Sequence, residues 1–139
     1  MEKVVSELHL GAVVAFKGYA DNISGVDNDA QIFGLTSRME GFDLAIMEAI
    51  SYGVIGITYD VNYGPNDIIL DSQNGYVVKY GDYTEMAAKM VQVLQNKDLL
   101  QELSNGAYQS SQRYSSSNIW KLWDGLLEDA KQDLGGDVK

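Results

Sequence analysis

The chain has 139 residues, 45% hydrophobic and 10% aromatic, which is enough for the packed core of one domain. Its twenty acidic and ten basic residues give a formal charge of −10, which repels nucleic-acid phosphates. It has no cysteine, no apolar run of about 18 residues and no apolar signal segment. We therefore expect a cytoplasmic domain with no transmembrane segment, no disulfide and no nucleic-acid partner.

The first third of the chain predicts one helix and two strands. Residues 1–10 have the apolar spacing of an amphipathic helix, and Gly11 is expected to end it. Residues 12–16 are an unbroken apolar run, which predicts a strand covered on both faces. Residues 21–28 are polar and predict a short helix or a loop, and residues 31–36 predict a second buried strand.

The middle of the chain continues this alternation. Residues 42–52 are apolar nearly all round, which indicates a buried helix ended by Gly53. Residues 54–59 predict a third strand, and Pro65 suits the first turn of a short helix. An Asn-Gly turn then leads into a fourth strand over residues 76–78.

The last third of the chain is helical in pattern. Helices are expected over residues 83–95, 98–112 and 117–131. Strands that alternate with helices predict an α/β, Rossmann-like parallel sheet flanked by helices. The domain is expected to cover residues 1–134, and residues 135–139 are expected to form a disordered tail.

The loops that follow the strands are where a ligand is expected, because open parallel sheets bind ligands beyond the carboxyl ends of their strands. For the first three predicted strands these loops are residues 17–20, 37–41 and 60–64. The second loop runs directly into the helix that begins at Phe42. Gly41 has no side chain to block approach, so the backbone N–H groups at this helix start predict a phosphate or diphosphate site.

Two carboxylates flank this helix start. Glu40 comes just before it and Glu48 about two turns in, roughly 10–12 Å away along the axis. A nucleoside diphosphate sugar has that reach, with the sugar near Glu40 and the ribose hydroxyls near Glu48. The pair also fits one glutamate favoured by the helix dipole and one on an exposed face. An idle charge between Met47 and Ala49 on an apolar helix would be costly, which favours the binding-site interpretation.

The segment from Glu40 to Glu48 resembles the E-x7-E motif of retaining, GT-B-fold glycosyltransferases of family 4. The order Leu35-Thr36-Ser37 before the motif and Gly53 after it are similar too. The resemblance spans most of the chain. It implies the nucleotide-sugar-binding C-terminal domain of an enzyme whose N-terminal acceptor domain is absent from this chain.

The resemblance also implies a role for each residue of the motif. Glu40 is the catalytic-site residue, in contact with the donor sugar near its reacting carbon, and Glu48 holds the ribose. Tyr19 and its neighbours line the base. The residues whose backbone amides hold sugar hydroxyls and phosphate are Gly41, Phe42, Asp43 and Leu44.

A narrower resemblance involves residues 59–69 and 74–78, which look like poly(glycerol-phosphate) alpha-glucosyltransferases. It implies a UDP-glucose donor and a teichoic acid acceptor, polymeric glycerol phosphate, which the missing N-terminal domain would bind at the inner face of the membrane. It implies no cofactor and no metal, and the sole histidine, His9, excludes multi-histidine metal sites within the chain. The chain alone is expected to be inactive.

Two alternatives to this function stay open. Enzymes that put N-acetylglucosamine on serine-rich adhesins share much of the pattern of residues 59–69 and 74–78. A non-catalytic Rossmann-like binding module would keep the fold without the chemistry. The donor-site interpretation and the binding-module interpretation differ in whether a UDP-sugar contacts the predicted loops.

Two features depart from the family pattern. The arginine and lysine that clamp the diphosphate have no counterpart, which leaves Lys17 and Arg38 as the nearby cations. Asp43 occupies a position where a small or uncharged residue is more common, and its carboxylate would repel phosphate unless it turns away or caps the helix. Near the end of the chain, Trp120 and Trp123 belong to an apolar helical stripe that is expected to pack against other elements.

Overall fold

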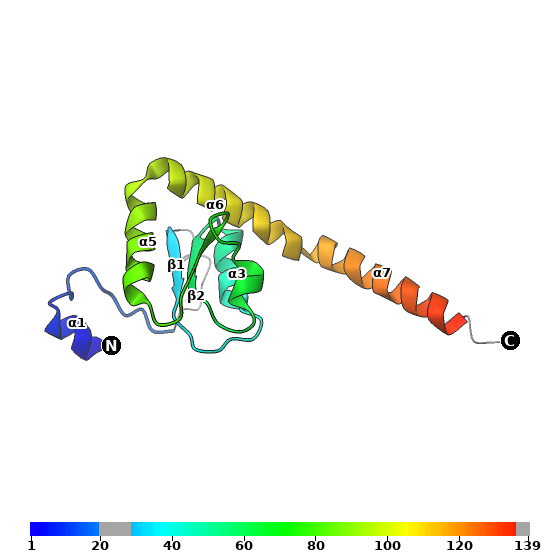
Figure 1. The fold of residues 1–139 in the computed structure, drawn as a ribbon, viewed down its shortest axis with the longest axis horizontal. Helices are drawn as coiled ribbons and strands as arrows, with labels where there is room; N and C mark the ends of the chain where they lie inside the picture. The colour runs from blue at the N-terminus through cyan, green and yellow to red at the C-terminus, as the bar shows by residue number, and fades with distance from the viewer. Residues whose placement is uncertain (20–28, 136–139) are drawn as a thin grey trace.

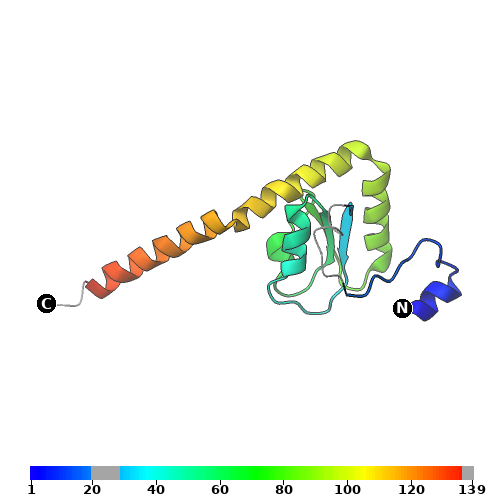
Figure 2. The ribbon, with the colours of Figure 1, turned by 180° about the vertical axis from the view of Figure 1, so that it is seen from behind.

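A computed structural model describes residues 1–19 and 29–135 of the protein. A small parallel sheet lies at the centre, with helices packed around it (Figure 1). Residue 1 and residue 135 lie on opposite sides of the sheet, and the view from behind shows the same arrangement (Figure 2). The helix or loop expected at residues 21–28 lies outside the described residues, as do residues 136–139 of the tail expected at 135–139, whereas residue 135 ends a helix.

The sheet consists of β1 (Ile32–Leu35), β2 (Ile55–Tyr59) and β3 (Gly75–Val78), in the order β1-β2-β3. Both pairings are parallel, with Ile57 opposite Tyr76 in the register of β2 and β3. Every residue of β2 is buried, as expected for a central strand that helices cover on both faces. The α/β parallel architecture predicted from the sequence is therefore confirmed.

The strand predicted at residues 12–16 is wrong. This segment begins in a turn and continues without regular structure, and Val13 is 79% exposed and Phe16 50% exposed. A strand is stable only when a neighbouring strand pairs with its backbone N–H and C=O groups, and the described residues hold no such partner beside this run. The apolar content of the run did not reveal that this partner is missing. The described sheet has three strands, whereas four were predicted.

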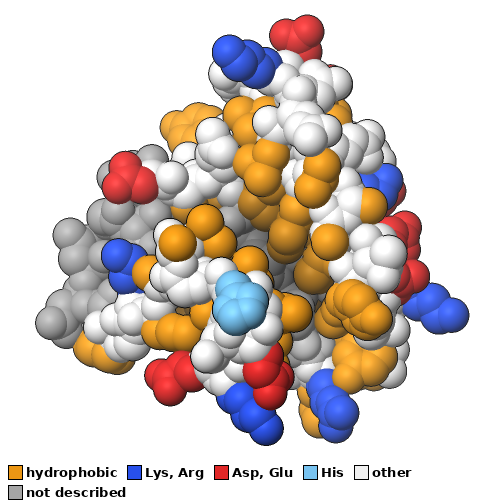
Figure 3. Space-filling model, turned by 90° about the vertical axis from the view of Figure 1, so that its left-hand side faces the viewer, with side chains coloured by type: hydrophobic (Ala, Val, Ile, Leu, Met, Phe, Trp, Pro, Cys, Tyr) orange, Lys and Arg blue, Asp and Glu red, His pale blue; other side chains and the backbone are white. Residues whose placement is uncertain are grey.

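Helix α1 (Glu2–Glu7) is shorter than the helix expected over residues 1–10, and none of its residues is buried. The chain turns where His9 adopts a φ of +56°, ahead of the glycine expected to end the helix. Apolar side chains gather on the face of the molecule around this histidine (Figure 3). The exposed ones from this part of the chain include Val4, Leu8 and Phe16.

Helix α3 (Leu44–Ser51) lies within the predicted range but is not buried all round. Ile46 and Ile50 are fully buried against the sheet side, whereas Leu44 is 66% exposed and Glu48 is also exposed. The helix packs on β2 and on α6 (Lys97–Ser111), which cover one side of it. The sequence pattern was apolar on both sides and did not show which side would be covered.

Two apolar clusters cover the two faces of the sheet. Alternate residues of β2 point toward α5 (Tyr83–Gln95), where Ile57 packs in one cluster with Met86 and Val93. The opposite face is covered by a second cluster from α3, α4 (Pro65–Ile68) and the end of α6, which contributes Ala107. The helices therefore form layers on both sides of the sheet, as the alternating pattern predicts.

A fully buried asparagine shapes the connection from α4 to β3. The Asn74 side chain donates from Nδ2 to the Ile68 carbonyl at 2.9 Å, and its Oδ1 accepts from the Leu70 N–H at 2.7 Å. These bonds satisfy backbone groups that no helix or strand pairs. The connection thereby ties the end of α4 to the start of β3, where Gly75 lies opposite Gly56 near the amino end of β2.

Helix α7 (Ser116–Gly135) follows the short helix η1 (Gln112–Tyr114) and projects from the body (Figures 1 and 2). Trp120 is 67% exposed and Trp123 55% exposed, so the packing expected for this stripe is not found among residues 1–19 and 29–135. No helix in those residues has both the length and the apolar character needed to cross a bilayer. The stripe of α7 is thus an exposed apolar surface.

Candidate functional site

Two of the predicted ligand loops meet at the carboxyl edge of the sheet. We call residues 36–43, after β1, the donor loop and residues 60–64, after β2, the second loop. A Cβ built on Gly64 would collide with the carbonyl oxygen of Gly41 and would lie 3.5 Å from the Glu40 Cβ. Gly64 has a φ of +81°, which favours glycine, so the second loop approaches the donor loop backbone to backbone.

Residues 17–20 are not placed in the same way. The Tyr19 side chain is 92% exposed, so it packs against none of the other candidate residues to any extent. Lys17 is exposed as well, and residue 20 lies outside the described part of the chain. Because the strand expected before this loop does not form, nothing in the sheet directs the loop toward the carboxyl edge. The donor loop itself contains a cation, Arg38, whose side chain is exposed.

Asp43 caps the helix that follows the donor loop. Its Oδ1 accepts from the backbone N–H groups of Ala45 at 3.1 Å and Ile46 at 3.2 Å. The residue is 7% exposed, and its Oδ2 is buried with no partner in the described structure. The carboxylate thus turns into the helix start, which is one of the two arrangements that reduce its conflict with a bound phosphate.

Backbone N–H groups remain available just before this cap. Among the described residues, the amides of Phe42, Asp43 and Leu44 have no hydrogen-bond acceptor. A Cβ built on Gly41 would meet no atom within 4 Å, so the space beside these amides is open. The helix start therefore offers accessible donors to an anion, although the Asp43 carboxylate already occupies the next two.

The two glutamates of the motif lie in different environments. Glu40 is half-buried beside Gly64, whereas Glu48 is exposed on α3. Because Glu48 is exposed, a charge there costs little even without a ligand. The sequence-based argument that an idle charge at Glu48 would be costly is therefore wrong. Glu48 does line a hollow of ≈ 260 Å³ together with Leu44, Met47 and Ser51. A carboxylate beside apolar side chains in a hollow can accept hydrogen bonds from a ligand that also covers apolar surface.

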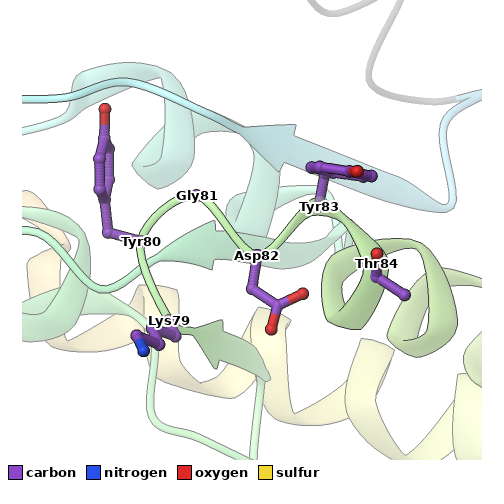
Figure 4. A pocket seen from close by; sticks show the side chains of 6 residues that line it. All are labelled: Lys79, Tyr80, Gly81, Asp82, Tyr83 and Thr84. Atoms are coloured by element: carbon purple, nitrogen blue, oxygen red, sulfur yellow. The ribbon is translucent and has the colours of Figure 1, made fainter.

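A third loop at this edge was missed by the sequence reasoning. The loop after β3 surrounds a hollow of ≈ 270 Å³ lined by Lys79, Tyr80, Gly81, Asp82, Tyr83 and Thr84. The two tyrosine rings extend to one side of the loop and Asp82 to the other (Figure 4). Tyr80 packs edge to face with Tyr59 at 5.6 Å, which links the hollow to the end of β2. The sequence signal that could have revealed this loop was its position directly after a predicted strand of the parallel sheet.

A residue far along the chain also contacts the donor loop. The ring of Tyr114, in η1, packs edge to face on Phe42 with 6.0 Å between the ring centroids. Its hydroxyl donates to the carbonyl oxygen of Asp67 on α4 at 3.0 Å. No local sequence pattern pointed to this contact, because it depends on how the helices pack.

Comparisons with known proteins agree with this geometry. The profile of Glycosyl transferases group 1 matches residues 1–110. The poly(glycerol-phosphate) alpha-glucosyltransferase of Bacillus subtilis (strain 168) is 30% identical over 123 residues, which cover 88% of this chain and 18% of that protein. The UDP-N-acetylglucosamine–peptide N-acetylglucosaminyltransferase GtfA subunit of Streptococcus gordonii is 30% identical over 126 residues, covering 86% of this chain and 25% of that protein.

A solved structure shows the same arrangement of elements. A mutant of Staphylococcus aureus TarM, in complex with Fondaparinux, alpha-GlcNAc-glycerol and UDP, superposes with a TM-score of 0.82 at 29% identity. The superposition covers 90% of this chain and 26% of TarM. The chain therefore spans about a quarter or less of the proteins it resembles. By its sequence profile and its fold, this chain belongs to the glycosyl transferases group 1 family.

Proposed function

We propose that this chain is the donor-binding part of a hexosyltransferase that uses a UDP-sugar. The observation that carries the proposal is the meeting of Gly41 with Gly64, which places the half-buried Glu40 next to the open start of α3. An anion site and a carboxylate that accepts hydrogen bonds from hydroxyls are then neighbours. Membership of the family and the presence of UDP in the TarM structure support this assignment.

The proposed donor lies along the outer side of α3. Its diphosphate accepts hydrogen bonds from the free amides of Phe42, Asp43 and Leu44. The transferred sugar lies at Glu40, and the ribose reaches the hollow that contains Glu48. Tyr19 remains a proposed contact of the base. The arrangement uses no metal and no cofactor.

The proposed reaction transfers the sugar with retention of configuration. The bond between the anomeric carbon and the diphosphate oxygen breaks, while the acceptor hydroxyl attacks the anomeric carbon from the same face and passes its proton to the departing diphosphate oxygen. Negative charge develops on the diphosphate as its bond to carbon breaks, and the α3 helix start stabilises that charge through its N–H groups. Glu40 holds the sugar hydroxyls during this step and so orients the reacting carbon.

The donor sugar and the acceptor are taken from the relatives. The name of the Bacillus subtilis enzyme supports glucose transfer to polymeric glycerol phosphate. Our first proposal is therefore teichoic acid glucosylation from UDP-glucose in the cytoplasm, at the inner face of the membrane. The Streptococcus gordonii protein is equally identical and supports N-acetylglucosamine transfer to a peptide as the second. We assign the acceptor to an N-terminal domain outside this chain, and we expect no glycosyl transfer from the chain alone.

Replacing Glu48 by glutamine tests the ribose contact. We expect UDP to move the amide NMR signals of Gly41, Phe42 and Glu48 in the unmodified chain. Glu48→Gln is expected to weaken UDP binding about fivefold to tenfold, because an exposed hydrogen bond from a ribose hydroxyl to a charged acceptor is replaced by a neutral one. The dissociation constant is measured by NMR titration or calorimetry.

The matched control is Glu102→Gln, which changes an exposed glutamate on α6. An equal loss of affinity in both variants would remove the ribose assignment. If millimolar UDP moved no amide around the donor loop, the donor-site proposal itself would fail and the binding-module alternative would remain. Comparing UDP-glucose with UDP-N-acetylglucosamine as donors of the intact enzyme separates the two proposed reactions.

A further inference from the structure

We infer that Tyr114 is a positioning residue for the donor loop, and that it holds the loop in the shape that binds the UDP diphosphate. The inference rests on the proposed function and deepens it. Tyr114 lies in η1, between α6 and α7, and touches neither of the motif's glutamates through any hydrogen bond in the described residues. Its effect on the ligand must therefore pass through the residues it contacts.

The first of these contacts is the ring of Phe42. The two rings meet edge to face, with 6.0 Å between centroids and 67° between planes. Phe42 is otherwise 59% exposed, and its neighbour Gly41 has no side chain with which to anchor the loop. Edge-to-face pairs favour one relative orientation, so the Tyr114 ring restricts where the Phe42 backbone lies.

The second contact is the carbonyl of Asp67. The Tyr114 hydroxyl donates to this oxygen at 3.0 Å, and the Arg113 guanidinium donates from Nη2 to the same oxygen at 3.3 Å. The same Nη2 also donates to the Tyr114 hydroxyl oxygen at 3.0 Å. The hydroxyl thus has a donor and an acceptor in place, which fixes the position of the tyrosine as well as that of α4.

These contacts close a ring that includes both ligand loops. The Asp67 N–H donates to the Gly64 carbonyl at 3.0 Å, and Gly64 lies against the carbonyl of Gly41. Gly41 is bonded to Phe42, which returns to Tyr114. Tyr114 therefore connects the donor loop to the second loop through α4, while the amides of Phe42, Asp43 and Leu44 have no acceptor among the described residues. A loop held in its binding shape loses less entropy when the ligand binds.

The test is Tyr114→Phe, which keeps the ring and removes the hydroxyl that reaches Asp67. We expect UDP binding to weaken about fivefold, as for the loss of one hydrogen bond that orders the site. We also expect the amide signals of Gly41 and Phe42 to shift in the ligand-free protein. The midpoint of urea unfolding should change little, because the apolar contact with Phe42 remains. Tyr114→Leu, which also removes the ring, should weaken binding further.

Tyr108→Phe is the control, since it removes the hydroxyl of a tyrosine on α6 that is 54% exposed. It is expected to leave UDP affinity and the donor-loop amides unchanged. If Tyr114→Phe bound UDP as tightly as the unmodified chain, the positioning role would be overturned while the donor site stood. If the unmodified chain bound no UDP, the proposed function would fall, and the amide shifts in the free protein would then decide whether Tyr114 shapes the loop.

Discussion

Replacing Gly64 by alanine is expected to lower the free energy of unfolding by about 3 kcal/mol and to displace the donor loop. The new Cβ would overlap the carbonyl oxygen of Gly41, which is backbone and cannot rotate away as a side chain does. The φ of +81° adds strain for any residue with a Cβ. The two loops must separate to relieve the overlap, and UDP binding should be lost together with their contact.

Gly81→Ala separates the two causes of this loss. Gly81 has a φ of +82°, but a Cβ built on it meets no atom within 4 Å. This variant is expected to lose about 1 kcal/mol from backbone strain alone. Urea unfolding of both variants measures the difference, and the amide signals of the donor loop show whether it has moved. Equal destabilisation of the two variants would show that the approach of Gly64 to Gly41 is unimportant for the fold.

Changing Asp43 to asparagine is expected to strengthen UDP binding roughly tenfold. The Asp43 carboxylate is buried at the helix start that the diphosphate is proposed to occupy. Like charges about 5 Å apart repel by the order of 3 kcal/mol at an effective dielectric constant near 20, solvent at this open helix start screens part of that repulsion, and asparagine removes it. Asparagine also caps helices about as well as aspartate, so the bonds to Ala45 and Ile46 should persist.

Asp82→Asn is the control for this change, because Asp82 caps α5 by accepting from the Glu85 N–H at 2.9 Å. It should leave UDP affinity unaltered. Asp43→Ala removes the cap itself and is expected to lower the free energy of unfolding by about 1–2 kcal/mol. Calorimetric titration with UDP gives the affinities. Weaker binding by Asp43→Asn would mean that the carboxylate contacts the ligand directly, as an acceptor for one of its hydroxyls.

The elements that the sequence predicted correctly are those whose signals are local. The parallel strands and α5 follow from apolar runs and helical spacing. The end of α3 was predicted from the glycine at position 53, which adopts a φ of +76° as helix-ending glycines often do. The strand expected at residues 12–16 failed because strand formation depends on a partner elsewhere. The burial of α3 was overestimated for a similar reason, since the pattern did not tell which side other helices would cover.

The candidate site shows the same division. The motif beginning at Glu40 was found because its residues are consecutive, and the structure brings the second loop to it through Gly64. Tyr114 and the hollow at Tyr80 were missed, because tertiary packing and not local pattern places them at the carboxyl edge. Tyr19 had been assigned by resemblance alone, and its exposed side chain contacts no other candidate residue.

The length of helix α7 determines how a rotation at η1, where Tyr114 lies, would move the end of the chain that the structure describes. Its 20 residues extend about 30 Å at 1.5 Å per residue, and the helix leaves the body directly after η1. A rotation of roughly 10° at η1 therefore moves the far end by about 5 Å, whereas the same rotation shifts the Tyr114 ring by far less. A small rotation at η1 thus displaces the far end of α7 strongly, and a force applied at that far end exerts a correspondingly large torque at η1. A load on its exposed tryptophans would be transmitted to η1, which contacts the donor loop through the ring pair of Tyr114 and Phe42.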